Sequence, residues 1–237
     1  MNNLVGKYKK DGEYSYALGT TIVFELLKNN IKCDCLYVHS KFRENEYTAQ
    51  IFEMAEAKKI EIINSDKIFN TLSDKENCFL IGKFKKYKKQ LVADANHVVL
   101  VNISNSGNLG TIMRTSLGFG IWNIAIIGQS VDIFDPKTIR ASMGAIFSLN
   151  VELFNNFEQY QAKFSIHSYY PFMLKAKTQL HNAHFTRPYS LIFGNESSGL
   201  DDKFLNMGTP IIIKHENTID SLNLAISVAI AIFHATK

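Results

Sequence analysis

The fold of this chain is indicated by the stretch NSGNLGTIMRT, residues 105–115, which follows the apolar run VVLV at residues 98–101. The run predicts a buried strand, and the stretch predicts a turn that opens a helix. Asn108 and Arg114 therefore come to a strand-to-helix junction, where α/β proteins place their binding residues. Two later segments carry similar polar groups, LIFGNESSGL at residues 191–200 and DSLNLA at residues 220–225.

The apolar pattern around this junction predicts alternating helices and strands in two parts of the chain. In the first part, helices are expected at residues 14–29, 45–58 and 66–72, and strands at 35–38, 60–63 and 78–82. The second part begins with strands at 98–103 and 122–127 and helices at 109–119 and 136–143. The alternation continues through residues 148–154, 157–164, 165–169, 189–193 and 210–213 to a final helix at 221–235. This rhythm predicts an α/β fold with a parallel sheet.

Two domains are expected, a small α/β domain at residues 1–90 and a larger one at 91–237. The excess positive charge lies in the first part, because residues 1–91 carry 16 Lys and Arg against 12 Asp and Glu, whereas residues 92–237 carry 10 against 10. The densest basic cluster, interleaved with aromatic residues, consists of Lys83, Lys85, Lys86, Lys88 and Lys89. Such a mixture suits phosphate contacts and base stacking, although a solvated lysine-rich linker is an equal alternative.

Composition and motif spacing exclude several classes of protein. With 46% hydrophobic residues the chain can bury a sizeable core, yet no apolar run approaches the roughly 20 residues of a membrane span. The polar N-terminus lacks the apolar core of a secretion signal, so a cytoplasmic location is expected. Cys33, Cys35 and Cys78 lack metal-ligand spacing and are interpreted as reduced thiols, with no metal site. Dinucleotide-binding, P-loop and serine-hydrolase motifs are all missing.

The glycines in the motifs favour a site that holds its ligand through backbone contacts. Gly107, Gly110, Gly194 and Gly199 stand at expected strand ends, where a residue without a Cβ lets the backbone approach a ligand closely. A carboxylate, Glu196, and a guanidinium, Arg114, stand beside them. Considered alone, Arg114 could be a surface residue and Glu196 a helix-terminal carboxylate, but three such motifs in order favour a group-transfer site.

Together the three motifs resemble the signature of the SpoU/TrmH family of RNA ribose methyltransferases, part of the SPOUT superfamily, over about residues 98–235. The resemblance implies a catalytic set composed of Asn108, Arg114, Glu196, Ser221 and Asn223. It also implies S-adenosylmethionine as the cofactor, held at Gly194, Ile213 and Leu222. Arg114 would act as an unusual base or as a clamp on a neighbouring phosphate, and its planar fork suits the clamp.

The same resemblance implies a trefoil-knotted methyltransferase domain, a homodimer with shared active sites, and RNA binding by the first 90 residues. The implied reaction is methylation of a ribose 2′-hydroxyl in structured RNA. Ribosomal RNA is preferred as the substrate because of the separate N-terminal domain, and transfer RNA is the alternative.

This chain departs from the family pattern at two places. Residues 105–106 read Asn-Ser where members usually have Asp-Pro, and residues 213–217 read IKHEN where Ile-Pro-Met-x-Gly is usual. The second departure alters a loop that should border the cofactor, so a non-catalytic RNA-binding protein with this fold stays an alternative. An unrelated α/β transferase would require the three motifs to be coincidence. His215, in this loop, is expected to face solvent rather than to be an added acid or base.

Overall fold

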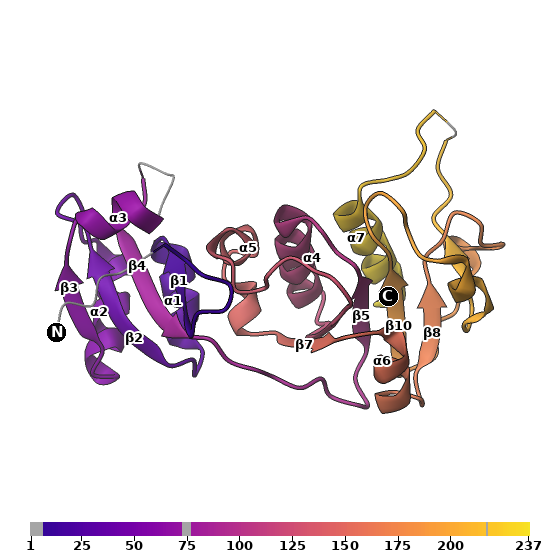
Figure 1. Cartoon of the computed structure of the whole chain (residues 1–237), viewed down its shortest axis with the longest axis horizontal. Coiled ribbons are helices and arrows are strands. Elements are labelled where there is room, and N and C mark those ends of the chain that lie inside the picture. Colours follow the sequence, from indigo (N-terminus) through magenta and orange to yellow (C-terminus); the bar gives the residue numbers. More distant parts are fainter. Residues whose placement is uncertain (1–6, 73–76, 217) are drawn as a thin grey trace. The chain divides into compact units, whose positions relative to one another are not determined.

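The computed structural model describes residues 7–72, 77–216 and 218–237 (Figure 1). The chain divides into two compact units, residues 1–87 with 132–147 and residues 88–131 with 148–237. Residues 132–147, which the sequence places in the second domain, thus group with the first unit. The segment carries an apolar set that is buried there, namely Ile133, Phe134, Ile139, Ile146 and Phe147.

The first unit is a four-stranded sheet with helices. In chain order its elements are β1 (Tyr14–Leu18), α1 (Thr20–Lys28), β2 (Cys33–Val38), α2 (Glu46–Ala57), β3 (Glu61–Asn64), α3 (Lys67–Leu72), β4 (Leu80–Lys85), α5 (Pro136–Ala141) and the 3₁₀ turn η1 (Ala145–Phe147). The strand order is β1-β4-β2-β3. β4 runs antiparallel to both β1 and β2, whereas β2 and β3 are parallel.

The expected helix at residues 14–29 is wrong over its first part, because Tyr14–Leu18 forms β1 and pairs with β4. The apolar residues Tyr16 and Leu18 suit either a strand or a helix, so periodicity over five residues could not separate the two. Gly19 decides the boundary: its backbone has φ 101°, a left-handed conformation that favours glycine, and α1 begins at the next residue.

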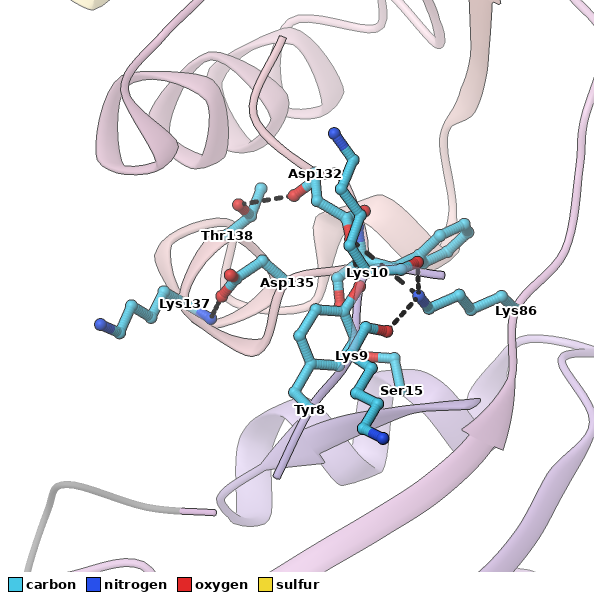
Figure 2. Close-up of polar contacts among 10 residues, drawn as sticks. Tyr8, Lys9, Lys10, Ser15, Lys86, Asp132, Asp135, Lys137 and Thr138 are labelled. Atoms are coloured by element: carbon cyan, nitrogen blue, oxygen red, sulfur yellow. Dashed lines mark hydrogen bonds and ion pairs between the residues drawn. The ribbon is translucent and has the colours of Figure 1, made fainter. Parts of the chain in front are cut away.

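Residues 132–147 are held in the first unit by aromatic and polar contacts. The ring of Phe84 lies 6.1 Å from that of Phe134 and 5.2 Å from that of Phe147. The hydroxyl of Ser15, a buried residue of β1, donates to the carbonyl of Phe134 at 2.5 Å. Figure 2 shows the neighbouring polar cluster, in which the phenol of Tyr8 donates to the carboxylate of Asp132. Side chains from the start of the chain therefore bind a segment more than 100 residues away.

The second unit is built on a five-stranded parallel sheet of order β7-β6-β5-β10-β8. Its elements are β5 (His97–Val101), α4 (Ser106–Gly118), β6 (Asn123–Ile127), β7 (Asn150–Phe154), α6 (Phe157–Lys163), β8 (Ser168–Pro171), β9 (Thr178–Gln179), η2 (Leu180–Asn182), β10 (Tyr189–Phe193), η3 (Asp202–Asn206), β11 (Ile211–Ile212) and α7 (Leu224–Ala235). The expected α/β class with a parallel sheet is confirmed. The short parallel pair of β9 and β11 forms a separate ribbon.

Both faces of this sheet are buried, which explains its near-continuous apolar strands. On one face Val99, Ala125 and Ile192 pack in a cluster with the aromatic residues of α6. The alternate residues Leu100 and Phe193 are also buried, and on their side α7 contacts β10 and packs against α4 (Figure 1). Within the described ranges, no helix is long and apolar enough to cross a membrane.

Candidate functional site

The first and second motifs meet at the carboxyl ends of β5 and β10. These strands are parallel neighbours, with Phe193 opposite Leu100, so the loops that follow them leave the same edge of the sheet. After β5 the chain enters α4, whose N-cap is Asn105. The side chain of Asn105 accepts a hydrogen bond from the backbone N–H of Asn108 at 3.0 Å, which fixes the start of the helix.

The carboxylate of Glu196, in the loop after β10, is the centre of the polar network. Its Oε2 accepts hydrogen bonds from the hydroxyl of Ser104 at 2.9 Å and from the backbone N–H of the same residue at 3.2 Å. Its Oε1 accepts from the backbone N–H of Asn105 at 3.1 Å and from Nδ2 of Asn108 at 3.2 Å. Both oxygens are thereby oriented by the start of α4.

The third motif joins the same network through Asn223. Its Nδ2 donates to Oδ1 of Asn108 at 3.2 Å. Its Oδ1 accepts from the backbone N–H groups of Ala225 and Ile226, at 2.9 and 3.3 Å, and so caps α7. Because the cap fixes the amide's orientation, Asn108 receives a donor from Asn223 and donates to Glu196. The three sequence motifs are thus joined by a chain of side-chain hydrogen bonds.

The hydrogen bonds decide the charge of Glu196. Partial burial acts to raise the pKa of Glu196, but hydrogen bonds from its own backbone, from Asn108 and from Ser104 outweigh that effect, so the pKa lies below its usual range. Glu196 is therefore ionised at neutral pH. As a carboxylate it accepts hydrogen bonds and orients their donors, and it holds no proton to give as a general acid.

Arg114 lies outside this network. Six residues beyond Asn108 along α4, its side chain projects from a different face of the helix and is exposed. Among the residues that the structure describes, the Arg114 guanidinium has no hydrogen-bond or ion-pair partner. Its five N–H donors are therefore available to a ligand. Ser221, in the loop before α7, is exposed as well.

A cavity of about 380 Å³ lies beside Glu196. Its wall includes the three residues expected to hold the cofactor, Gly194, Ile213 and Leu222, together with Glu196 and Ser221. Asn108, Arg114 and Asn223 are not part of the wall. The site residues expected from the sequence therefore separate into a group that lines the cavity and a group at the start of α4 and α7.

Gly194 is required by the close approach of two backbone segments. A Cβ at this position would lie 2.1 Å from the carbonyl carbon of Gly199, which no packing adjustment of side chains can relieve. Asn195 holds the loop between them: its Nδ2 donates to the carbonyl of Asn102 at 2.7 Å, and its Oδ1 accepts from the backbone N–H of Ser197 at 2.9 Å. The loop that carries Glu196 is thus anchored to the end of β5.

Residues 95–233, more than half of the chain, match the model of the SpoU rRNA methylase family. The chain belongs to the SpoU family. Residues 16–78 match a second model, described as RNA 2′-O ribose methyltransferase substrate binding. The family recognised from three short motifs is thereby confirmed.

Two curated relatives illustrate how this SpoU protein is related to others. An uncharacterized tRNA/rRNA methyltransferase of Synechocystis sp. is 30% identical over 143 residues, which are 59% of this chain and 52% of that protein. The 23S rRNA (guanosine(2553)-2′-O)-methyltransferase RlmP of Bacillus subtilis is 26% identical over 178 residues, 72% of this chain and 70% of RlmP. The matched region is thus about half the length of the first relative.

Solved structures share the fold of the SpoU chain over nearly its whole length. The AdoMet-bound rRNA methyltransferase from Sinorhizobium meliloti superimposes with a TM-score of 0.81 at 24% identity, covering 94% of this chain and 86% of that one. AviRb from Streptomyces viridochromogenes, in complex with AdoMet, gives a TM-score of 0.81 at 16% identity, with 94% and 90% covered. At these identities the likeness concerns the fold.

Two lysines of the SpoU protein that were expected to bind nucleic acid form ion pairs within the first unit. Nζ of Lys83 lies 3.0 Å from a carboxylate oxygen of Asp34 and 4.1 Å from the ring centre of Tyr14. Nζ of Lys85 lies 2.6 Å from a carboxylate oxygen of Glu13, and this pair is exposed. Both lysines therefore have a competing anion on the protein itself.

Of the remaining lysines, Lys86 and Lys89 donate to backbone carbonyls. Nζ of Lys86 contacts the carbonyls of residues 9 and 10 at 3.2 and 2.7 Å (Figure 2), and Nζ of Lys89 contacts the carbonyl of Leu149 at 2.9 Å. Burial lowers the pKa of both side chains. Lys88 is exposed. Structural contacts therefore occupy much of the lysine cluster.

Three residues of the site were not singled out as site residues by the sequence. Ser104 stands next to the first motif and holds Glu196, whereas Asn195 lies within the second motif and holds its loop. The signal that could have indicated them is their residue type, Ser before a helix and Asn in a tight turn. His215 was expected to face solvent, yet it is partly buried and lines the cavity. Its ring is hydrogen-bonded to the backbone carbonyl of Ile213, a contact that no pattern of side chains in the sequence indicates.

Proposed function

We propose that this protein uses S-adenosylmethionine to methylate a ribose 2′-hydroxyl in structured RNA, with ribosomal RNA as the preferred substrate. The observation that carries the proposal is the hydrogen-bonded chain from Glu196 through Asn108 to Asn223, which joins three distant motifs beside a cavity. The named activity of RlmP supports the same reaction and the same class of RNA. A transfer RNA substrate is the alternative.

The cavity fits this cofactor. A volume of about 380 Å³ is within the range of small-molecule sites. The stacked rings of Phe172 and Phe193, 4.5 Å apart, supply an apolar part of the wall, and Gly194 lines the cavity beside them. We assign the cofactor contacts to Gly194, Ile213 and Leu222. When bound, S-adenosylmethionine supplies a methyl group on a positively charged sulfur.

The residues outside the cavity would orient the RNA. An arginine stays protonated in proteins, and Arg114 is exposed, so its fork suits a clamp on the phosphate beside the reacting ribose better than it suits a base. That clamp would place a phosphate oxygen near the 2′-hydroxyl, where it can take the proton as the methyl group is transferred. Ionised Glu196 holds Asn108, and Ser221 offers a hydroxyl at the mouth of the cavity.

The two expected domains keep their expected roles in this proposal. Residues 1–90 bind RNA largely through its shape and phosphates, as the match to a substrate-binding model supports. Residues 91–237 carry the transfer reaction, and we expect their C-terminal segment to form the trefoil knot of the family. The exposed Lys88 is the cluster residue best placed for phosphate contacts, and the other four need release from their partners. A cytoplasmic location and the absence of a metal remain predictions.

A homodimer is part of the proposal. Ile226, Ile230 and Phe233 follow one face of α7 and are 52%, 38% and 49% exposed. The ring of Phe119, itself 42% exposed, lies 6.0 Å from that of Phe233 and extends the apolar surface from α7 onto the end of α4. Large contiguous apolar surfaces of this kind mark association sites. A second copy of the chain would bury it.

The experiment is transfer of labelled methyl groups from S-adenosylmethionine to total RNA that lacks the modification, followed by nuclease digestion and nucleoside mapping. A 2′-O-methylated nucleoside in ribosomal RNA is the expected product. Arg114→Ala should abolish it, whereas Arg140→Ala, which removes an arginine from the first unit, should not. A 2′-O-methylated nucleoside found in transfer RNA instead would identify transfer RNA as the substrate. No transfer by a protein that still binds RNA would favour the non-catalytic alternative.

A further inference from the structure

His215 stands in the loop after β11, where its ring is partly buried in the cavity wall. Its Nδ1 lies 3.0 Å from the carbonyl oxygen of Ile213. A carbonyl oxygen can only accept a hydrogen bond, so the hydrogen of the neutral ring must be on Nδ1. Nε2 then carries a lone pair, and His215 gives the cavity a hydrogen-bond acceptor on a side chain whose tautomer the backbone has fixed.

The charged side chains of the wall differ in whether they already have hydrogen-bond or ion-pair partners. Glu196 already accepts several hydrogen bonds, as described above. Nζ of Lys175, the only lysine or arginine among the described residues of the wall, lies 2.7 and 2.8 Å from the two carboxylate oxygens of Asp202. Asp220 is exposed at the cavity, and the described part of the chain provides no hydrogen-bond or ion-pair partner for its carboxylate. The wall therefore offers acceptors and uncompensated negative charge.

A cavity with these groups favours a ligand that brings donors and positive charge. S-adenosylmethionine has a sulfonium, an ammonium and a carboxylate, so its net charge is one unit more positive than that of its demethylated product. Resting on the proposed function, we propose that His215 hydrogen-bonds the bound cofactor through Nε2, and that the negative charge of Asp220 makes the cavity bind the cationic methyl donor in preference to the product. Product release would then follow directly from loss of the charge.

Calorimetric titration with S-adenosylmethionine and with S-adenosylhomocysteine tests this inference without measuring catalysis. His215→Leu should weaken both ligands by roughly fivefold, the value of one neutral hydrogen bond. His215→Gln, which retains an acceptor, should restore most of that affinity. His215→Lys places a fixed cation in the wall and should weaken binding of the donor more than binding of the product. Asp220→Asn removes a negative charge and should likewise reduce the preference for the donor.

His181→Leu is the matched control, because His181 is an exposed histidine in η2 of the same unit and does not line the cavity. Thermal unfolding of each variant verifies that the fold is retained. The inference would be overturned if substitutions at residue 215 did not change the affinity for S-adenosylmethionine, or if His215→Lys weakened both ligands equally. Either result would leave the proposed function standing. If the unsubstituted protein binds neither ligand, the proposed function and this inference both fail.

Discussion

Ser104 shows how much of the site depends on a single small side chain. Its hydroxyl and its backbone N–H both donate to Oε2 of Glu196, and the resulting orientation is passed through Asn108 to Asn223. A hydrogen bond to a charged group contributes more than one between neutral groups. The conformation of Asn108 therefore depends on Ser104 although the two side chains do not need to touch.

Replacing Ser104 by alanine should slow methyl transfer by roughly tenfold, because one charge-assisted hydrogen bond to Glu196 is removed. Loss of this donor also raises the pKa of Glu196 toward its ordinary value, so the acidic limb of the rate profile should move to higher pH. The measurement is kcat between pH 5 and 8 at saturating RNA. Ser104→Thr keeps the hydroxyl and should behave like the unsubstituted protein, and an equal loss in both variants would contradict this role.

At this scale the sequence indicates residue types better than it indicates partners. Asn108, Glu196 and Asn223 could be named because they stand in recognisable motifs. The lysine cluster was also easy to see, but Lys86 donates to two backbone carbonyls and Lys89 to another, contacts that depend on distant parts of the chain. A count of charges cannot tell a lysine that binds RNA from one that binds its own backbone.

Among the elements, the end of β10 is a place where two backbone segments approach too closely to admit a Cβ. Gly194→Ala would put a Cβ 2.1 Å from the carbonyl carbon of Gly199 and displace the loop that carries Glu196. We expect the free energy of unfolding to fall by about 1–3 kcal/mol and cofactor affinity to fall at least about tenfold. Denaturant unfolding and calorimetry measure the two effects.

Gly118→Ala is the control for that substitution, because an added Cβ near the end of α4 meets no atom within 4 Å. Alanine in a helix is favoured over glycine, so the control should be neutral or more stable by about 0.5 kcal/mol. Equal effects of the two substitutions on cofactor binding would show that the Gly194 contact does not shape the cavity.

The contact of β5 with α6 buries a histidine, which makes the stability of the second unit depend on pH. His97 is buried, with Nε2 2.9 Å from the carbonyl of Val92 and Nδ1 2.8 Å from the hydroxyl of Tyr160. Burial lowers the pKa of His97 from 6.5 to about 4. Between these values the unfolded chain binds a proton that the folded chain does not, so stability falls as the pH falls, by up to about 3 kcal/mol.

Urea unfolding at pH 7, 6 and 5 checks this expectation, because most of that range lies above the region where carboxylates are protonated. The free energy of unfolding should decrease steadily from pH 7 to pH 5. His97→Gln should be less stable at pH 7 and show a smaller decrease, with the remainder assigned to His167, whose pKa burial also lowers. A slope unchanged by the substitution would mean that His97 is not the group responsible.

The elements themselves were predictable in proportion to their length and pattern. The strands of the parallel sheet are apolar on both faces, and α4 has a capping residue before it, so β5, β6, β10 and α4 could be placed from periodicity alone. β1 could not be placed in this way, because its five residues, Tyr14–Leu18, fit the apolar period of a helix as well as that of a strand. β9 and β11 have two residues each, and their pairing depends on a contact between distant segments.

For the molecule as a whole, the sequence order hides one part of the organisation. Residues 132–147 lie between β6 and β7 in the chain, yet they form part of the first compact unit through Phe134 and Phe147. A single boundary in the sequence cannot describe a unit that is made of two separate segments of the chain. The division of charge at residue 91 is also a single boundary, so it too assigns residues 132–147 to the second part.

The apolar face of α7 leads to the last prediction, which concerns assembly. Ile226, Ile230 and Phe233 lie four and three residues apart and so share one side of the helix, while the opposite side, with Val228 and Ile232, is buried. A helix that is apolar all round is stable in water only when both sides are covered. The unsubstituted protein should therefore be a dimer by light scattering coupled to size exclusion.

Ile230→Glu introduces a charge at the middle of that face and should shift the protein to a monomer at micromolar concentration, because burying an unpaired carboxylate in an interface is costly. Ile166→Glu makes the same change at a residue that is 66% exposed outside α7 and should leave the dimer intact. If each protomer's site needs its partner, the Ile230 variant should also lose methyl transfer while its far-ultraviolet circular dichroism is unchanged. A monomeric variant with full activity would separate the dimer from catalysis and confine the reaction to the Glu196, Asn108 and Asn223 chain of one protomer.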